Sequence, residues 1–205
     1  MVQMASDGIA APAYRMANPE LVAFASDAGT TYDYNPARAK ELLAQAGYPD
    51  GFDVGTLSTL NGTYDKLAQW LLSNLAEIGI RGSIQIFESS SYITDAFTSN
   101  YTIGVFGGPV GSDMNDYSVF YLSSLFSQGN IARRVNPQLD DLFARGMAEI
   151  DDGKRQEIYD EAVSLIQDSA LYIPVMNAVQ VTAYDEDLNY SSAKRFAFAY
   201  DWSWN

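Results

Sequence analysis

Residues 52–87 change their apolar periodicity twice, and this pattern constrains the fold more than any other feature of the chain. Residues 52–57 have the composition of a strand, apolar residues then recur at helical spacing through residues 63–78, and residues 83–87 alternate again. A strand, a helix and a strand within about 35 residues form a βαβ unit. The two strands are therefore expected to be parallel and joined by a right-handed crossover.

The other elements are predicted from cap, turn and periodicity signals. Asn35 followed by Pro36 is typical of a helix start, and Gly47 is expected to end that helix in the left-handed conformation. Further elements are predicted at residues 90–98 (helix), 101–106 (strand), 117–126, 137–149 and 153–168 (helices), and 171–175 and 179–184 (strands). No repeat or clear linker divides the chain, so one α/β domain is the economical expectation.

The composition excludes several kinds of chemistry. The chain has 205 residues with 26 acidic and 12 basic side chains, no His, no Cys and a net charge of -14. Without Cys and His there can be no disulfide, zinc–thiolate site or Ser-His-Asp triad. The negative charge argues against a nucleic-acid partner, because few cations are available to replace the counterions of phosphate. No run of residues is long and apolar enough for a transmembrane helix.

A glycine-rich segment follows the strand expected at residues 101–106. It consists of Gly107, Gly108, Pro109, Val110 and Gly111. The glycine spacing fits neither common phosphate-binding loop, and no Lys follows it. The alternative is a strand-to-loop transition where the backbone passes close to another group. A ligand could be that group, because ligands of open α/β sheets lie beyond the carboxyl ends of the strands.

Two carboxylates, Asp113 and Asp116, lie just beyond this segment. They could serve acid–base chemistry, hold a hard cation or face a cationic ligand. The simplest alternative is a solvated turn in which an Asp caps a short helix. Arg133 and Arg134 could pair with a carboxylate ligand, although a surface salt bridge is the simpler role.

Residues 32–52 read YDYNPARAKELLAQAGYPDGF. This segment strongly resembles the YDPEKAKELLAEAGYPDGF signature of the peptide/nickel class (family 5) of ABC-transporter solute-binding proteins, which includes the dipeptide- and oligopeptide-binding proteins. Later segments resemble the family in the same order: LAEIGI at residues 75–80, the loop region at 106–120, NPQLDDL at 136–142 and IPV at 173–175.

The resemblance implies a periplasmic-binding-protein type II-like lobe, with a mixed, mostly parallel sheet flanked by helices. Members of this family have two lobes that close on a ligand and then dock on a membrane permease. Residues 1–205 are expected to be the C-terminal lobe alone, with the N-terminal lobe and the signal region missing. Residues 1–34 would be an irregular lead-in, 35–190 the α/β core and 191–205 a tail toward the missing lobe.

The resemblance also implies how such a protein works. We expect a monomer located outside the cytoplasm, either in the periplasm or lipid-anchored at the cell surface. Its partners would be a peptide or similar small solute, the missing lobe and the ABC permease. No catalysis, cofactor or bound metal is expected.

The same resemblance implies a ligand site. Asp113 matches the family Asp that receives the α-ammonium group of a peptide, and Asp116 matches a second acid. Val110 replaces a family Trp, Tyr117 replaces a Pro, and Gly107 replaces an Arg that reads the peptide carboxylate in some relatives. The expected ligand contacts are Asp113 first, and then Gly107, Gly108, Pro109, Val110, Tyr117 and Asp116.

These departures leave the ligand class open. An acidic anchor without its aromatic and cationic neighbours fits peptides, oligosaccharides and other small solutes. The absence of His disfavours nickel. A more distant alternative is a hydrolase that uses Asp113 and Asp116 as its two carboxylates.

Overall fold

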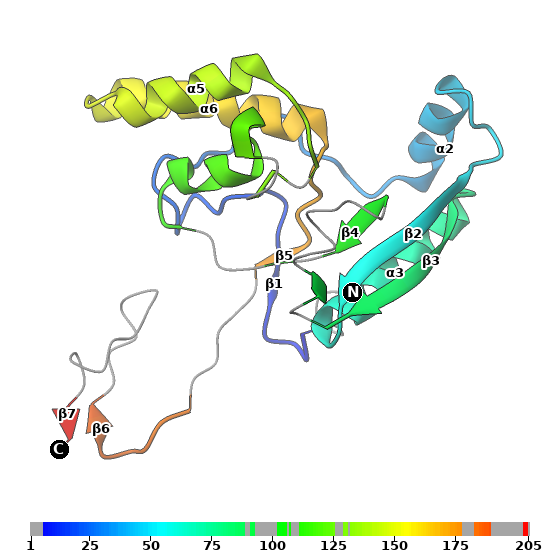
Figure 1. Cartoon of the computed structure of the whole chain (residues 1–205), viewed down its shortest axis with the longest axis horizontal. Helices are drawn as coiled ribbons and strands as arrows, with labels where there is room; N and C mark the ends of the chain where they lie inside the picture. The colour runs from blue at the N-terminus through cyan, green and yellow to red at the C-terminus, as the bar shows by residue number, and fades with distance from the viewer. Residues whose placement is uncertain are drawn as a thin grey trace.

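The structure, a computed structural model, describes residues 6–88, 91–92, 102–105, 107, 111–125, 129–130, 132–177, 183–189 and 203–204. Two regions stand apart in Figure 1. The sheet region consists of the described residues of 35–105, and the helical region consists of the described residues of 6–34 and 111–177.

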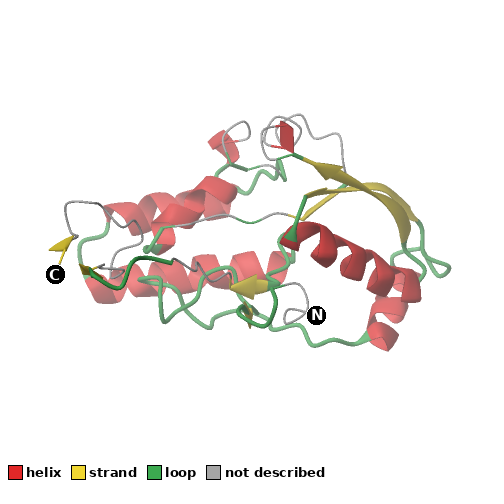
Figure 2. Ribbon diagram, turned by 90° about the horizontal axis from the view of Figure 1, so that it is seen from below, coloured by secondary structure: helices red, strands yellow, loops and turns green. Residues whose placement is uncertain are grey.

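The sheet region contains three parallel strands in the order β3-β2-β4. Its elements are α2 (Pro36–Gln45), β2 (Asp53–Leu60), α3 (Thr63–Glu77), β3 (Arg81–Phe87) and β4 (Ile103–Val105). Helix α3 joins β2 to β3 and lies along one face of the sheet (Figure 2). The parallel pairing of β2 and β3 predicted from the sequence is confirmed. β2 runs past its expected end at residue 57 because the fully buried Ser58 and Thr59 continue the ladder with β3.

The helix start predicted at Asn35-Pro36 is confirmed, and the helix predicted at residues 137–149 begins in the same way, after Asn136. The side chains of Asn35 and Asn136 each accept a hydrogen bond from the backbone N–H three residues further on, with N···O distances of 2.9 and 3.2 Å. They cap α2 and α5 (Pro137–Ala148), and Pro follows each cap because the first helical N–H has no partner to lose. Gly47 follows α2 with φ 91°, as the sequence predicts.

Helices α5 and α6 (Asp152–Ser169) pack side by side and support the core of the helical region (Figure 1). This core consists of Ala17, Val22, Met114, Tyr117, Tyr121, Leu139, Leu142, Phe143, Tyr159, Ala162, Val163 and Ile166. The Tyr121 and Phe143 rings stack with centroids 6.2 Å apart. Ala17 and Val22 belong to the lead-in, so this irregular segment is part of the core.

The helix expected near residues 117–126 is replaced by two short 3-10 helices. They are η1 (Met114–Phe120) and η2 (Ser123–Leu125). η1 starts earlier than expected because Asp113 caps it.

The strand expected at residues 171–175 is wrong. The strand β5 is instead Met176–Asn177, and it pairs antiparallel with β1 (Ala11–Pro12). Pro174 has no N–H to donate to a ladder, which explains why regular pairing begins only beyond it.

Several predictions fall on residues that the structure does not describe. The helix expected at residues 90–98 is described only at residues 91–92, which are helical, and the strand expected at 179–184 only at 183–184. Residues 101 and 106 of the strand expected at 101–106 are also outside the description. Strands β6 (Leu188–Asn189) and β7 (Ser203–Trp204) form an antiparallel pair.

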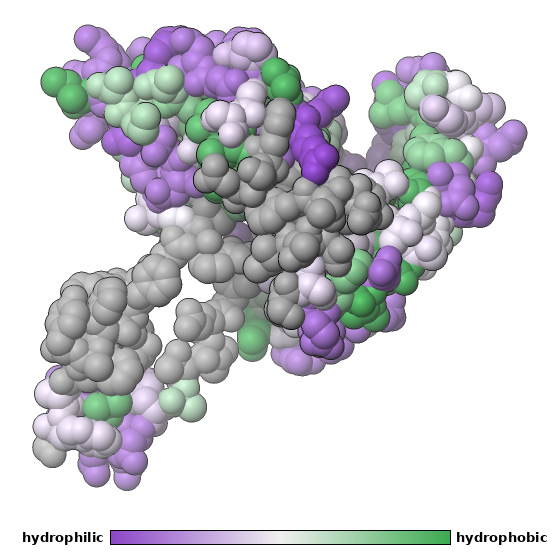
Figure 3. Space-filling view, viewed as in Figure 1, coloured by the Kyte–Doolittle hydropathy of each residue, from purple (hydrophilic) through white to green (hydrophobic). Residues whose placement is uncertain are grey.

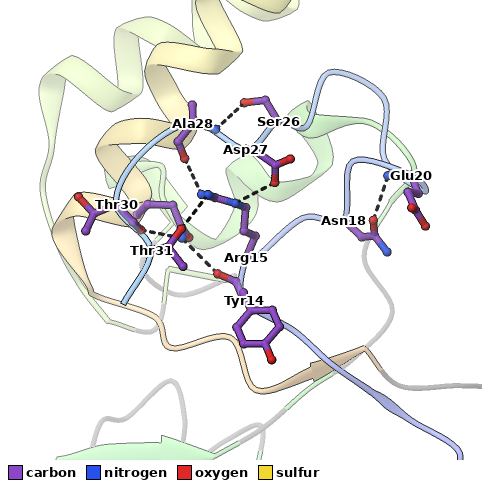
Figure 4. Close-up of polar contacts among 10 residues, drawn as sticks. Tyr14, Arg15, Asn18, Glu20, Ser26, Asp27, Ala28, Thr30 and Thr31 are labelled. Carbon is purple, nitrogen blue, oxygen red and sulfur yellow. Dashed lines mark hydrogen bonds and ion pairs between the residues drawn. The ribbon is translucent and has the colours of Figure 1, made fainter. Parts of the chain in front are cut away.

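Polar contacts that centre on Arg15 hold the lead-in together, and separate contacts attach it to α6 (Figure 4). The Arg15 guanidinium donates to Asp27 Oδ1 at 3.0 Å, to the Ala28 carbonyl at 2.6 Å and to Thr31 Oγ1 at 3.1 Å. Thr30 donates its backbone N–H and its hydroxyl to Asp168 Oδ1 on α6. An irregular segment is thus fixed by side chains in place of a backbone ladder.

In Figure 3, hydrophilic side chains cover most of the visible face of α5 and α6, and apolar groups are scattered. None of the described helices is long and apolar enough to cross a membrane.

Candidate ligand-binding site

The candidate site is the loop that begins η1. Ala23 of the lead-in forms a parallel bridge with Asp113, supported by a 2.9 Å hydrogen bond from the Met114 N–H to the Ala23 carbonyl. Asp113 Oδ1 accepts from the Asn115 N–H at 2.8 Å, and Asp116 Oδ2 accepts from the Asp113 N–H at 3.2 Å. The helix-capping alternative raised for these acids is therefore confirmed as their local role.

Asp113 also forms an ion pair with Arg155, from the first turns of α6. One guanidinium nitrogen, Nη2, lies 3.0 Å from Asp113 Oδ1 and 3.0 Å from Oδ2. The side chains of Asp113 and Arg155 are 30% and 22% exposed, so the pair is partly buried yet reaches solvent. The carboxylate that the sequence places in a solvated turn already has an internal cation.

Aromatic rings fix the position of Arg155. Its guanidinium carbon lies 4.2 Å from the centroid of the Phe24 ring and 5.5 Å from that of Tyr159. Phe24 has φ 61°, a backbone conformation that is costly for an aromatic residue, and its carbonyl accepts a 3.3 Å bond from Gln156 Nε2. The Nε of Arg155 is buried and has no hydrogen-bond partner among the described residues.

Tyr159 forms the buried floor beneath this pair. Its side chain is fully buried, and burial raises the pKa of the Tyr159 phenol, while the neighbouring Arg155 guanidinium opposes that shift. The phenol therefore stays protonated at neutral pH and adds no charge beside Asp113.

The other acid, Asp116, is exposed and shapes the approach to η1. A β-carbon at position 111 would overlap the Asp116 carboxylate, so only a glycine at this position allows the backbone to lie this close to Asp116. Gly107 is the last described residue before the loop, and a β-carbon there would lie 2.8 Å from the Tyr64 hydroxyl. Burial raises the pKa of Tyr64, which starts α3 at the carboxyl end of β2.

The other predicted contacts have different surroundings. Gly108, Pro109 and Val110 lie outside the described residues. Tyr117 is only 6% exposed and belongs to the hydrophobic core, so a ligand contact through its side chain stays a prediction. Arg134 contacts Asn130 through backbone atoms, and the carboxylate-binding role considered for the basic pair at residues 133–134 also stays a prediction.

Two residues of the site were missed at the sequence level. Arg155 is 42 positions after Asp113 and lies in the helix predicted at residues 153–168, for which no functional residue was predicted. Phe24 precedes both and lies in a segment with no periodic pattern. No local spacing joins these residues, so only the packing of the lead-in between η1 and α6 brings them together.

The structure thus combines a three-stranded parallel sheet with a helical region, and Asp113 is a partly exposed carboxylate in the loop that begins η1. The chain belongs to the family described as bacterial extracellular solute-binding proteins, family 5, whose middle-region model matches residues 1–131. The resemblance noted in the sequence is thereby confirmed.

Two curated relatives illustrate the range of the family. Heme-binding protein A of Haemophilus influenzae is 30% identical over 155 residues, which cover 72% of this chain and 28% of that protein. The glutathione-binding protein GsiB of Salmonella paratyphi A is 29% identical over 201 residues, covering 92% of this chain and 38% of that protein. The chain thus spans roughly a third of the length of the curated relatives it matches.

A solved structure supports the fold. The dipeptide-binding protein of Pseudoalteromonas sp. SM9913, solved with Met-Leu, matches with a TM-score of 0.82 and 23% identity over 93% of this chain and 39% of that one. The periplasmic-binding-protein fold expected from the sequence is confirmed. The relatives described above are named as binding proteins, and none of their names denotes an enzyme.

Proposed function

We propose that the chain is part of the solute-binding component of a bacterial ABC importer and captures peptides or similar small solutes. Membership in family 5 carries this proposal. Glutathione is itself a peptide, and the relative named for binding it aligns along 92% of this chain. The partly exposed Asp113 gives such a ligand a carboxylate to approach.

The proposed architecture is one lobe of a two-lobed protein. The relatives are far longer than the part that this chain matches, which leaves room in them for a second lobe. A ligand held between two lobes closes them like a hinge, and the closed form is the one a permease would receive. We place this step outside the cytoplasm, with the protein acting as a monomer.

The chemistry of the site is hydrogen bonding to Asp113. An ionised carboxylate offers about four acceptor positions. Arg155 uses one on each oxygen, and the Asn115 N–H uses a second on Oδ1. About one position therefore remains, on Oδ2, for an N–H of the ligand. A hydrogen bond to a charged group contributes about 1.5–3 kcal/mol.

The test is calorimetric titration of the whole two-lobed protein described by this proposal with glutathione and with Met-Leu, supported by thermal unfolding. At least one peptide should bind and raise the unfolding temperature, and Asp113→Asn should weaken binding about tenfold or more. Asp141→Asn is a matched control, because that exposed acid on α5 forms its ion pair with Arg145, away from the candidate site. Unchanged affinity in Asp113→Asn would remove Asp113 from the site, and no binding of either peptide would overturn the peptide proposal for this chain.

A non-peptide ligand is the second candidate, and the relative named for binding heme favours it. Titration with hemin, followed by its visible absorbance, distinguishes the two. A spectral shift that saturates at one equivalent, without peptide binding, would support the second candidate.

A further inference from the structure

We infer that Arg155 is a positioning residue that sets the charge preference of the Asp113 site. It holds the carboxylate from the protein side and balances its charge, so that the site accepts one hydrogen-bond donor without requiring a cation. This inference rests on the proposed function of Asp113 as a ligand contact.

The charge balance follows from the contact between the two side chains. A single nitrogen of Arg155 lies 3.0 Å from both carboxylate oxygens of Asp113. No other ion pair to Asp113 occurs among the described residues, and Asp116, the nearest acid in the loop, contacts the Asp113 backbone N–H. A ligand ammonium at Asp113 would therefore meet a neutral pair and not an isolated negative charge.

The position of Arg155 is fixed by its surroundings. Phe24 stacks on the guanidinium, and Tyr159 lies four residues further along α6 beneath it. Phe24 adopts its costly backbone conformation in a segment that the Ala23–Asp113 bridge ties to the same loop. Because both ends of the ion pair are held by the same short stretch of the lead-in, Arg155 cannot leave Asp113 without disturbing Phe24.

This arrangement predicts an unusual selectivity. An isolated carboxylate prefers an ammonium over a neutral N–H donor by charge alone. With Arg155 beside it, Asp113 accepts the same hydrogen bond but has a smaller electrostatic preference for an ammonium over a neutral N–H donor. Peptides with a free amino group and their N-acetylated forms should then bind with similar affinity where the acetyl group fits.

The experiment compares matched ligand pairs on the same whole two-lobed protein: Met-Leu with N-acetyl-Met-Leu, and glutathione with N-acetylglutathione. The measured quantity is the ratio of dissociation constants within each pair. Arg155→Met should raise the preference for the free amine by about tenfold relative to the native protein. Arg155→Lys keeps the charge and should leave the ratio within about twofold, even where both affinities fall because the flat guanidinium that stacks on Phe24 is lost.

Arg145→Met is the control for net charge, because it removes one cation from an exposed pair on α5. It should leave the ratio unchanged. Urea unfolding of each variant checks that it is folded, and if Arg155→Met fails to fold, Arg155→Gln takes its place beside Phe24.

Two results would overturn the inference, and they have different consequences for the proposed function. If a peptide binds but Arg155→Met leaves the ratio unchanged, the inference fails while the proposed function stands. If no member of either pair binds the native protein, the peptide function fails and the inference fails with it.

Discussion

The sheet region and the helical region of this molecule are stabilised in different ways. Helix α2 buries no side chain and α3 buries two, whereas α6 alone buries five. The sheet region depends on a parallel ladder with one covering helix, and Ile86 and Leu42 stay half exposed. The helical region has a dense core made by segments from both ends of the described chain. A region of this molecule can therefore have regular helices and strands and still bury few side chains.

The largest expected effect tests the core of the helical region. Phe143 is 2% exposed, and Phe143→Ala should lower the free energy of unfolding by about 3–5 kcal/mol because it leaves a cavity among aromatic rings. Leu42→Ala, at a half-exposed position of α2, should change it by less than about 0.5 kcal/mol. Urea denaturation measures both. Similar losses for the two variants would contradict the contrast between the regions.

The next effect concerns the close contact between α5 and α6. A β-carbon at Gly146 would lie 2.6 Å from the ring of Tyr159, so Gly146→Ala should cost about 1–3 kcal/mol. Gly153→Ala is the matched control, since its β-carbon meets only Asp151 Oδ1 at 3.3 Å. Helix propensity should make that control neutral or stabilising by up to about 1 kcal/mol. Equal destabilisation of both variants by thermal unfolding would mean that the ring contact is unimportant.

Helix caps sharpen the comparison because the same motif occurs in both regions. Asn136→Ala should lower global stability by about 1 kcal/mol, because α5 is part of the core. Asn35→Ala removes the same bond from a helix that buries nothing, so it should loosen α2 with little global effect. Hydrogen exchange of α2 amides, together with urea denaturation, separates the two results. A global loss of equal size for Asn35→Ala would show that α2 is coupled to the core.

The smallest effect is a pH dependence where the lead-in meets α6. Hydrogen bonds from the Thr30 hydroxyl and N–H lower the pKa of Asp168 below its ordinary value of 3.8. A lowered pKa adds stability at neutral pH, which is lost as the pH falls through the folded-state value. Thr30→Val should therefore be slightly less stable than the native chain at neutral pH, and the gap should close in acid. A gap that persists under acidic conditions in urea denaturation would argue against this contact.

The sequence predicts well where the physical cause is local. The Asn-Pro caps at residues 35 and 136, the glycine after α2 and the periodic run of α3 each depend on neighbours within a few residues, and all of them are found. The parallel strands follow from the length of the crossover. The missing strand at residues 171–175 shows the limit, because apolar composition there favoured a ladder that Pro174 interrupts.

The candidate site could be predicted only in part for the same reason. A capping Asp could be predicted here because Asp113 and Asp116 share one turn. The role of Asp113 as a ligand anchor came only from the family resemblance and stays a prediction. Arg155 and Phe24 were not predicted, since their contact with this turn depends on the lead-in crossing between two distant elements. Arg155 and Asp113 are 42 residues apart, so no short sequence motif indicates that they form an ion pair.

The hydrogen bond between Thr30 and Asp168 joins residues 138 positions apart. This separation determines which region can fold first while the chain is being translated. The three parallel strands are complete once residue 105 has left the ribosome, so the sheet region can assemble early. The lead-in, though made before the sheet region, has no permanent place until α6 emerges, on the order of ten seconds later. The nascent chain therefore carries the exposed side chains of Val22 and Phe24 while residues 35–169 are being made, and chaperones that recognise apolar segments would find them there.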